Sequence, residues 1–441
     1  MSKQWMLLLT AAMLLFGVIG CGSDDDNSSP TGPNDSNITI LTGTITDDLT
    51  LTADKTYLLR GGVFIGNDVD QTLLTIEPGT VIYGESATMG MLVIRRGSKI
   101  MAEGTKEHPI IFTSDKEAGQ RGRGNWGGLI INGRAPLNTG DEAFGEGGTG
   151  FYGGTVANDN SGILKYVRVE FAGQEISPDN ELNGIAFQGV GSGTTVDYVQ
   201  VHMNKDDGIE FFGGTVNAKH CLVTGCADDQ FDWTDGWQGM GQFWVCQQYG
   251  DDADQGIEAD NNAEDNTALP RSNPMIYNIT LIGDKDGAES DIGMLLREGT
   301  GAVIRNAIVM NFGDCAIDID HEETFNNAWN GSNLNGNLVV DNSIFYNNEE
   351  IWQSGEEDEV GFPFTTQSFI ETLNSHNRFA NPGLVNPLSK TAPDFRPAGG
   401  SAATIEATNT PDNGFFEAVS FIGGVDPNND WTTDWTTSVS N

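Results

Sequence analysis

The chain has 441 residues, and its 63 aspartates and glutamates against 22 lysines and arginines give a formal net charge of −41. Such an acidic chain, which has no cluster of basic residues, repels a phosphate backbone, so nucleic-acid binding is excluded. Neutral sugars and divalent cations are easier partners. The 57 glycines indicate many turns, and a hydrophobic content of 38% is enough for a core in a chain of this length.

Residues 1–20 have the pattern of a secretory signal peptide, because Lys3 precedes an apolar stretch over residues 5–19. The stretch is short for a membrane-spanning helix, which needs about 20 apolar residues. It ends in the sequence VIGC, which resembles the lipobox of bacterial lipoproteins. The resemblance implies that Cys21 becomes the first mature residue and carries the lipid that attaches the protein to a membrane. An ordinary signal peptide followed by an incidental cysteine is the alternative.

Residues 21–38 are polar and acidic, so we expect a flexible tether after the lipidated cysteine. Gly22 rather than aspartate follows Cys21, which argues against retention in the inner membrane. Residues 23–26 resemble the acidic export tag of surface-exposed bacterial lipoproteins, although a generic acidic linker has the same composition. We therefore predict a protein of the outer membrane, on the cell surface rather than the periplasmic face.

An apolar triad recurs along the body of the chain, with two residues between its first and second members and one between its second and third. The shortest step between successive triads is 22 residues, from Val196 to Ala218. A second short segment with two-residue alternation follows a polar turn in most units, as in a β-strand. The triads are Leu164/Val167/Val169, Val196/Val199/Val201, Ala218/Cys221/Val223, Met240/Phe243/Val245, Ile276/Ile279/Leu281, Ile304/Ala307/Val309 and Val340/Ser343/Phe345.

Repeats of this size predict an all-β chain that forms a single right-handed parallel β-helix with inserted loops over residues 39–380. A C-terminal capping segment over residues 381–441 completes the organisation. A β-sandwich would show hairpin dipeptides between its strands, and a propeller would have a longer repeat.

Several segments resemble a family of exported bacterial β-helix lipoproteins with the pectin-lyase-like fold. The N-terminal ones are residues 74–82, 92–100, 104–114 and 126–136. Further matching segments are residues 164–173, 295–300, 393–397 and 421–425, followed by Trp431 and Trp435. The resemblance implies a fold, a secretion route and an outer-membrane setting, and it implies no particular activity.

Four carboxylates follow equivalent inward residues of the short alternating segments, so alternation predicts that they point outward in one stack. The preceding turns add further aspartates. Because neighbouring rungs lie about 4.8 Å apart, such carboxylates repel unless they are protonated or share a cation. Ca²⁺ suits them best, since it accepts six to eight oxygen ligands in irregular geometry; a solvated acidic face is the alternative. The candidate ligands are Asp206, Asp207, Glu210, Asp228, Asp229, Asp232, Asp254, Glu258 and Asp318.

The function that we favour is a non-catalytic binding or adhesion protein, with a glycan or an outer-membrane protein as its partner. The main alternative is a Ca²⁺-dependent polysaccharide lyase, whose base would be Arg297, with Lys205 behind it. A glycoside hydrolase with two carboxylates and an accessory of an outer-membrane transport system also remain open.

The remaining reactive side chains give weaker signals. Cys221, Cys226, Cys246 and Cys315 allow disulfides in an exported protein, but buried free thiols are equally consistent with their positions. The five histidines are scattered, so zinc ligation is not expected. Phe211 and Trp233 are predicted to face the core and Phe212 to face outward.

Overall fold

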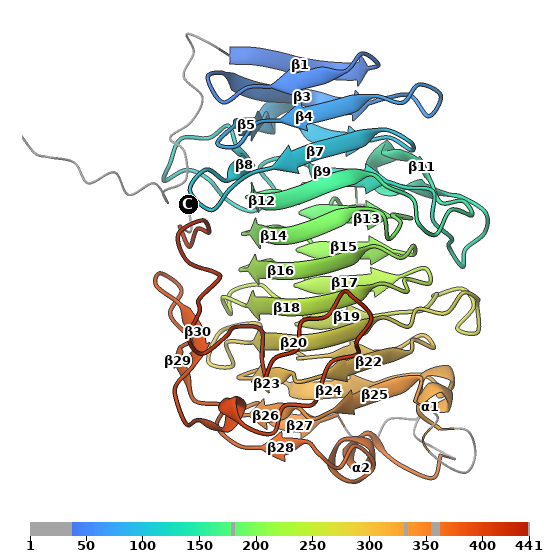
Figure 1. Ribbon diagram of the computed structural model, residues 1–441, viewed down its shortest axis with the longest axis vertical. Coiled ribbons are helices and arrows are strands. Elements are labelled where there is room, and N and C mark those ends of the chain that lie inside the picture. Colours follow the sequence, from blue (N-terminus) through green and yellow to red (C-terminus); the bar gives the residue numbers. More distant parts are fainter. Residues whose placement is uncertain (1–37, 178–180, 330–333, 335, 354–361, 440–441) are drawn as a thin grey trace, which may run out of the picture.

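The computed structural model describes residues 38–177, 181–329, 334, 336–353 and 362–439. The chain coils around one long axis, and the strands of successive turns lie side by side (Figure 1). Within the described residues, 26 strands join into one sheet whose neighbouring strands pair in parallel. The predicted all-β parallel β-helix is therefore confirmed. The predicted signal peptide, Cys21 and nearly all of the tether lie outside the described residues.

Each turn of the chain contributes to three faces of the β-helix. The first face contains β2 (Leu49–Leu51), β4 (Leu73–Ile76), β7 (Lys99–Glu103), β22 (Ala302–Arg305) and β25 (Leu338–Asp341). The second contains β5 (Val81–Gly84), β8 (Ile110–Ser114), β23 (Ile308–Met310), β26 (Ile344–Tyr346) and β28 (Arg378–Phe379). The third contains β6 (Met91–Ile94), β9 (Gly128–Asn132), β13 (Ile185–Gln188), β15 (Ile209–Phe212), β17 (Phe231–Thr234), β19 (Ile257–Ala259), β21 (Leu295–Leu296), β24 (Cys315–Ile319) and β27 (Glu350–Trp352).

Longer strands run through two faces and connect these columns. Five of them pass from the first face to the second, and β1 (Ile38–Ile45) and β3 (Thr56–Ile65) pass from the second to the third. Two short helices, α1 (Glu322–Ala328) and α2 (Thr366–Ser368), lie near the C-terminal end of the coil in Figure 1. The five strands are β12 (Gly162–Glu170), β14 (Thr195–His202), β16 (Asn217–Thr224), β18 (Met240–Gln247) and β20 (Met275–Ile282).

A left-handed residue at the corner between the first two faces explains the spacing of the apolar triads. Tyr166, Tyr198, His220 and Phe243 occupy this corner in successive rungs, with φ of 50°, 55°, 47° and 61°. The corner residue takes one position out of the alternation, so two residues rather than one separate the first and second inward side chains. The corner rings stack on one another, with centroids 4.5 Å apart for Tyr166 and Tyr198.

One of the predicted triads is wrong by one residue. In β18 the residues aligned with the inward side chains of β16 are Gly241, Trp244 and Cys246 rather than Met240, Phe243 and Val245. Trp244 fills the space above Gly241, where a Cβ atom would lie 2.7 Å from the indole ring. The apolar character of Phe243 and Val245 has another cause, because the C-terminal part of the chain covers them.

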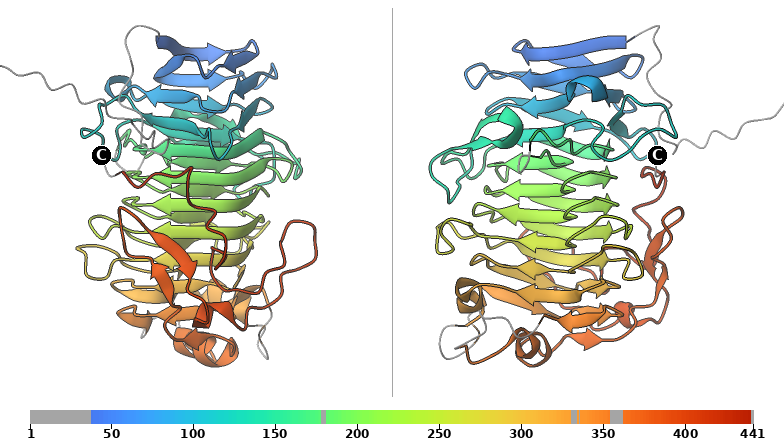
Figure 2. Two further views of the ribbon diagram at one scale, coloured as in Figure 1. Left: turned by 60° about the vertical axis from the view of Figure 1, so that its left-hand side comes forward. Right: turned by 180° about the vertical axis from the view of Figure 1, so that it is seen from behind.

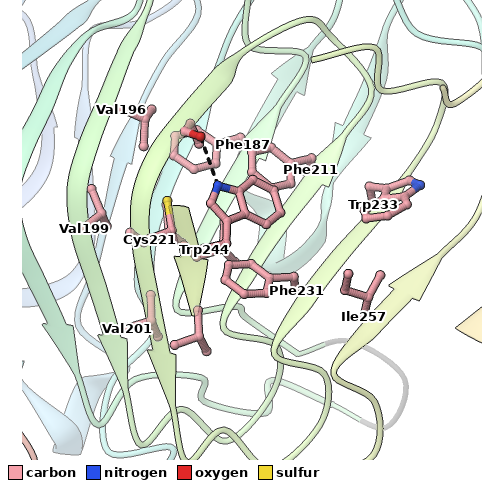
Figure 3. Close-up of a cluster of buried hydrophobic side chains, with 14 of the residues drawn as sticks. Phe187, Val196, Val199, Val201, Phe211, Cys221, Phe231, Trp233, Trp244 and Ile257 are labelled. Atoms are coloured by element: carbon pink, nitrogen blue, oxygen red, sulfur yellow. Dashed lines mark hydrogen bonds between the residues drawn. The ribbon is translucent and has the colours of Figure 1, made fainter. Parts of the chain in front are cut away.

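The interior of the coil is a continuous apolar column in which aromatic rings stack. Figure 3 shows Phe187, Phe211, Phe231 and Trp244 facing this interior. The ring centroids of Phe187 and Phe211 are 5.3 Å apart, and those of Phe231 and Trp244 are 4.6 Å apart. The inward placement of Phe211 and Trp233 is confirmed, since both are fully buried. Cys221, Cys226, Cys246 and Cys315 are free and buried, so among the described residues these cysteines are buried thiols rather than disulfides.

Residues 384–439, which we call the strap, fold back along the outside of the second face and include β29 (Leu384–Asn386) and β30 (Asp394–Pro397). Figure 2 shows this segment beside the stacked strands, and its end lies near β12 (Figure 1). Phe395, Phe421, Trp431 and Trp435 of the strap form a second buried cluster with outward apolar residues of the strands. Both surfaces of the second face are therefore buried where the strap covers it, from β16 to β26.

Amide side chains of the coil pair with the backbone of the strap. Gln200 accepts a hydrogen bond from the backbone N–H of Thr437 (2.8 Å) and donates one to its carbonyl oxygen (2.7 Å). Gln242 makes the same reciprocal pair with Glu417, and Asn306 makes it with Thr408. These pairs mimic a strand–strand ladder and satisfy backbone groups that the strap would otherwise bury unpaired. Among the described residues, no helix has the length and apolarity to cross a membrane.

Candidate metal centre

Carboxylates gather on the outer side of the third face, as the alternation predicted. Glu210 of β15 pairs in register with Asp232 of β17, which pairs with Glu258 of β19. The turns that lead from the second face into these strands bring aspartates to the same edge. These turn residues are Asp206, Asp207, Asp228 and Asp229.

Seven of the nine predicted ligands form three overlapping groups, which we call the carboxylate ladder. In each group the carboxylate oxygens lie within 4.8 Å of one another. Asp207 belongs to the first two groups and Asp232 to the last two, so the ladder is continuous. The groups are Asp206/Asp207/Asp228, Asp207/Glu210/Asp232 and Asp229/Asp232/Glu258.

Asp318 and Asp254 lie outside these groups. Asp318 lies in the same outward column as Glu258, as predicted, but Leu295 of β21 pairs with both residues and interrupts the stack between them. The rung that contains β21 has only two residues in strand conformation, so it gives no alternation that a sequence pattern would reveal. Asp254 is exposed at the rim of the ladder.

The ladder is far more buried than a solvated acidic face. The exposed fractions are 7% for Asp207, 7% for Glu210, 3% for Asp229 and 8% for Asp232. Two of these carboxylates accept hydrogen bonds from the backbone. The Asp229 N–H donates to Asp207 Oδ1 (3.1 Å), and the Gln255 N–H donates to Asp229 Oδ1 (2.7 Å). Glu210 accepts a short hydrogen bond from the Asn183 side chain. Burial at this level contradicts the alternative of a freely hydrated surface.

Asp232, at the centre of the ladder, has no such partner. Its Oδ1 is buried, and among the described residues no hydrogen-bond donor reaches it. A buried carboxylate without a donor or a basic neighbour is costly, since desolvation penalises its charged form. Something other than the described side chains must compensate this charge, or a proton must remove it.

Burial and mutual repulsion raise the pKa of every carboxyl in the ladder. Burial, with the charge of Asp228, raises the pKa of Asp206 to about 8. Burial, with the charge of Asp260, raises the pKa of Glu258 to about 8. For Asp232, burial and the charge of Glu210 raise the pKa well above its ordinary value. The ladder therefore resists holding its full negative charge unless a cation is present.

The two candidate lyase bases are both engaged in ion pairs. Arg297, just after β21, places Nη2 2.7 Å from Glu258 Oε2 and Nε 2.9 Å from Asp260 Oδ1. Burial disfavours its charge, but the hydrogen bond and charge of Asp260 prevail and raise the pKa of Arg297 above its usual range. The Lys205 Nζ lies 3.3 Å from Asp252 Oδ2 at a half-exposed position.

Asp260 is the member of this site that the sequence reasoning left out of the candidate ligands. It lies two residues after Glu258, so alternation already placed it on the same outer side. Its role is visible only with Arg297 in place, because the guanidinium joins Asp260 to the end of the ladder. The predicted outward position of Phe212 holds, although its side chain is half-buried against a small apolar cluster around Ala186.

Residues 43–381 match the family described as the pectate-lyase like beta helix domain, and the chain belongs to this family. A comparison with curated proteins finds no match. The family fixes the fold, whereas the chemistry must be argued from the side chains.

The raised pKa values predict that the metal-free protein loses stability as pH rises. The folded state holds protons up to about pH 8 at Asp206 and Glu258, while the unfolded chain has released them. Between about pH 7.5 and 9 His202 adds almost no slope, because its imidazole is neutral both in the unfolded chain and in the folded protein, where burial lowers its pKa to about 4. The melting temperature in EDTA should therefore fall by several degrees across this window. An unchanged or rising melting temperature would contradict the raised pKa values, and a variant with Asp206→Asn and Glu258→Gln should show a flatter profile.

Proposed function

We propose that this protein is a lipid-anchored, non-catalytic binding β-helix whose carboxylate ladder holds Ca²⁺. The observation that carries the cation is Asp232, which is buried without a donor between two groups of converging carboxylate oxygens. A divalent cation bound there would interact with several carboxylates at once, which separate protons cannot do.

The ligand types favour Ca²⁺ over other metals. The three groups contain only carboxylate oxygens, which suit hard cations, and no histidine or cysteine, which zinc and copper prefer. Ca²⁺ tolerates irregular geometry at about 2.3–2.6 Å from its oxygens, whereas Mg²⁺ demands a near-octahedral shell. Asp207, Asp229 and Asp232 have the positions to contribute the inner ligands, with Glu210 and Glu258 on either side.

We expect Ca²⁺ to raise the melting temperature of EDTA-treated protein, because a ligand that binds only the folded state stabilises it. The gain is about 2.7 kcal/mol when free Ca²⁺ exceeds its dissociation constant a hundredfold. Asp232→Asn should abolish the Ca²⁺ response in thermal unfolding and in calorimetric titration. Asp254→Asn, which changes an acidic residue outside the groups, serves as the matched control and should respond like the wild type. Equal melting temperatures of the wild type in Ca²⁺ and EDTA would exclude the cation.

The absence of catalysis is inferred from Arg297. A lyase base must accept a proton from its substrate, but Glu258 and Asp260 together hold this guanidinium in its charged form. The formal charge of −41 also disfavours a polyanionic substrate at this edge.

Incubation with polygalacturonate and Ca²⁺ at several pH values should leave the ultraviolet absorbance flat, because the two candidate bases, Arg297 and Lys205, are both held in ion pairs. A pectate lyase in the same buffer supplies the positive control. A steady rise in absorbance that Arg297→Gln removes would establish the lyase alternative and overturn the non-catalytic proposal.

The anchor rests on the lipobox-like sequence that ends at Cys21 and on the acidic residues after it. Wild-type protein should sediment with outer membranes and be degraded when intact cells are treated with protease. The Cys21→Ala variant should be lost from the outer-membrane fraction, since the residue that carries the lipid is gone. The presence of this variant in the outer-membrane fraction at the wild-type level would contradict lipidation, and survival of the wild type on protease-treated cells would place it on the periplasmic face.

A further inference from the structure

The N-terminal end of the coil carries a free strand edge. Among the described residues, β1 pairs only with β3, and β2 pairs only with β4, so no strand lies above either of them (Figure 1). Beside Gly43 the end is open, since a Cβ atom there would meet no other atom within 4 Å. A free edge of this kind presents unpaired backbone N–H and C=O groups to any strand that approaches it.

The apolar column is uncovered at the same end. Ile45 is partly exposed, although the equivalent Ile65 one turn below it is fully buried. Leu49 is partly exposed as well, although the equivalent Leu74 is 1% exposed. Both side chains occupy inward positions, so they lack cover because no further turn of the coil stacks on them. Terminal turns of a repeat architecture need a cap, since the open end of an apolar column is costly in water.

The C-terminal end of the column, in contrast, is closed by the chain itself. α2 contacts β24 and β27 at this end, and the π-helical turn Phe369–Leu373 follows it. Phe364, Phe369 and Ile370 are buried there as part of the main core cluster. Within the described residues, the coil therefore caps one of its ends and leaves the other open.

Charge favours a second copy of this end as the missing cover. β1 and β2 have the sequences ITILTGTI and LTL, without a charged residue, in a chain whose formal net charge is −41. Two such edges can approach without repulsion between the strands, and they lack the charges and prolines that protect edge strands from pairing. The preceding residues 22–37 are unsuited to cover an apolar end, because they contain four aspartates, two prolines and no aliphatic or aromatic residue.

The first turn of the coil is also complementary to itself. A twofold axis normal to the third face at Thr44 makes the chains of two copies antiparallel, so residues 43–45 pair with the same residues of the second copy. Residues 38–41 then face β2 of the second copy, because these segments flank Thr44 on the two neighbouring faces. The rise of one coil is compensated by that of the other, so both pairings have the same spacing.

This pairing also matches the character of the side chains. Inward residues face inward ones, with Leu41 of one copy against Leu49 of the other, so the two columns join. The acidic turn with Asp47 and Asp48 lies beside Thr42 of the second copy rather than beside its own equivalent. The arrangement therefore covers apolar side chains without placing these carboxylates against each other.

We propose that two copies of this protein bind end to end through β1 and β2, as a twofold dimer with one apolar column running through both coils. The interface lies at the N-terminal end, away from the strap, and it contains no residue of the carboxylate ladder. The dimer does not depend on the cation proposed there and forms equally in Ca²⁺ and in EDTA.

Full-length protein with Thr44→Cys tests this arrangement on intact cells, because exported proteins meet oxidising conditions. Thr44 lies on the axis and faces itself, and directly opposite residues have Cβ atoms about 4.5–5.5 Å apart, close to the range that a disulfide spans. Most of the variant should migrate at twice the monomer mass on a non-reducing gel. Val69→Cys is the matched control, since Val69 is 83% exposed on the loop between β3 and β4 and should remain monomeric.

A second measurement uses two differently tagged copies of the full-length protein, extracted together in detergent. Wild-type copies should co-purify, and Thr44→Lys should abolish co-purification because it places like charges on the axis. The melting temperature of this variant should equal that of the wild type, since Thr44 is exposed. Val69→Lys should co-purify like the wild type.

Four results would overturn the dimer and leave the Ca²⁺ proposal untouched. They are failure of wild-type copies to co-purify, unchanged co-purification of Thr44→Lys, equal cross-linking of Val69→Cys and Thr44→Cys, and cross-linking of Thr44→Cys to a different protein only. The last result would assign the free edge to another partner.

Discussion

Parallel in-register stacking constrains every other feature of this protein. Successive rungs place equivalent residues about 4.8 Å apart, so whatever a position carries is repeated along the axis. Inside the coil the repetition is favourable, as in the stack of Phe187 on Phe211 with centroids 5.3 Å apart. Outside, the same register places Glu210, Asp232 and Glu258 on one another. A shift by one residue would separate the charges but turn the core outward, so the repulsion cannot be relieved by a change of register.

The fold was predictable because alternation and the repeated apolar triad both follow from one buried interior. At β18 the apolar triad gave the wrong inward residues, because this strand is buried on its outer side as well as its inner side. Phe243 and Val245 are apolar because the strap covers them, and Trp244 and Cys246 are apolar because they face the core. When both sides of a strand are buried, hydrophobicity alone cannot determine which side faces inward. The strap itself contributes few strand residues and makes its contacts through scattered aromatic residues, so local periodicity does not reveal its position.

In the carboxylate ladder, too, alternation within a strand predicted some features, whereas features that depend on contacts between distant residues could not be predicted. Which carboxylates are neighbours followed from the alternation, because Glu210, Asp232 and Glu258 each come one residue after an inward side chain. Their burial did not follow, since it depends on packing around the ladder rather than on the strands. The break at Leu295 was hidden for a related reason, because β21 is too short to show a period. The pairing of Arg297 with Asp260 joins residues 37 positions apart, and only the coil brings them together.

A buried carboxylate can be compensated by a hydrogen-bond donor, a basic side chain, a proton or a cation, and the ladder uses the first two unequally. Asp207 and Asp229 accept backbone N–H groups, Glu210 accepts the Asn183 amide, and Glu258 has Arg297. Asp232 has neither kind of partner, and it belongs to both the Asp207/Glu210/Asp232 group and the Asp229/Asp232/Glu258 group. A proton on Asp232 would compensate this residue alone and would leave the repulsion among its neighbours in place. A divalent cation beside it would be within reach of oxygens from both groups, so the least compensated residue occupies the position where one ion would relieve the most charge.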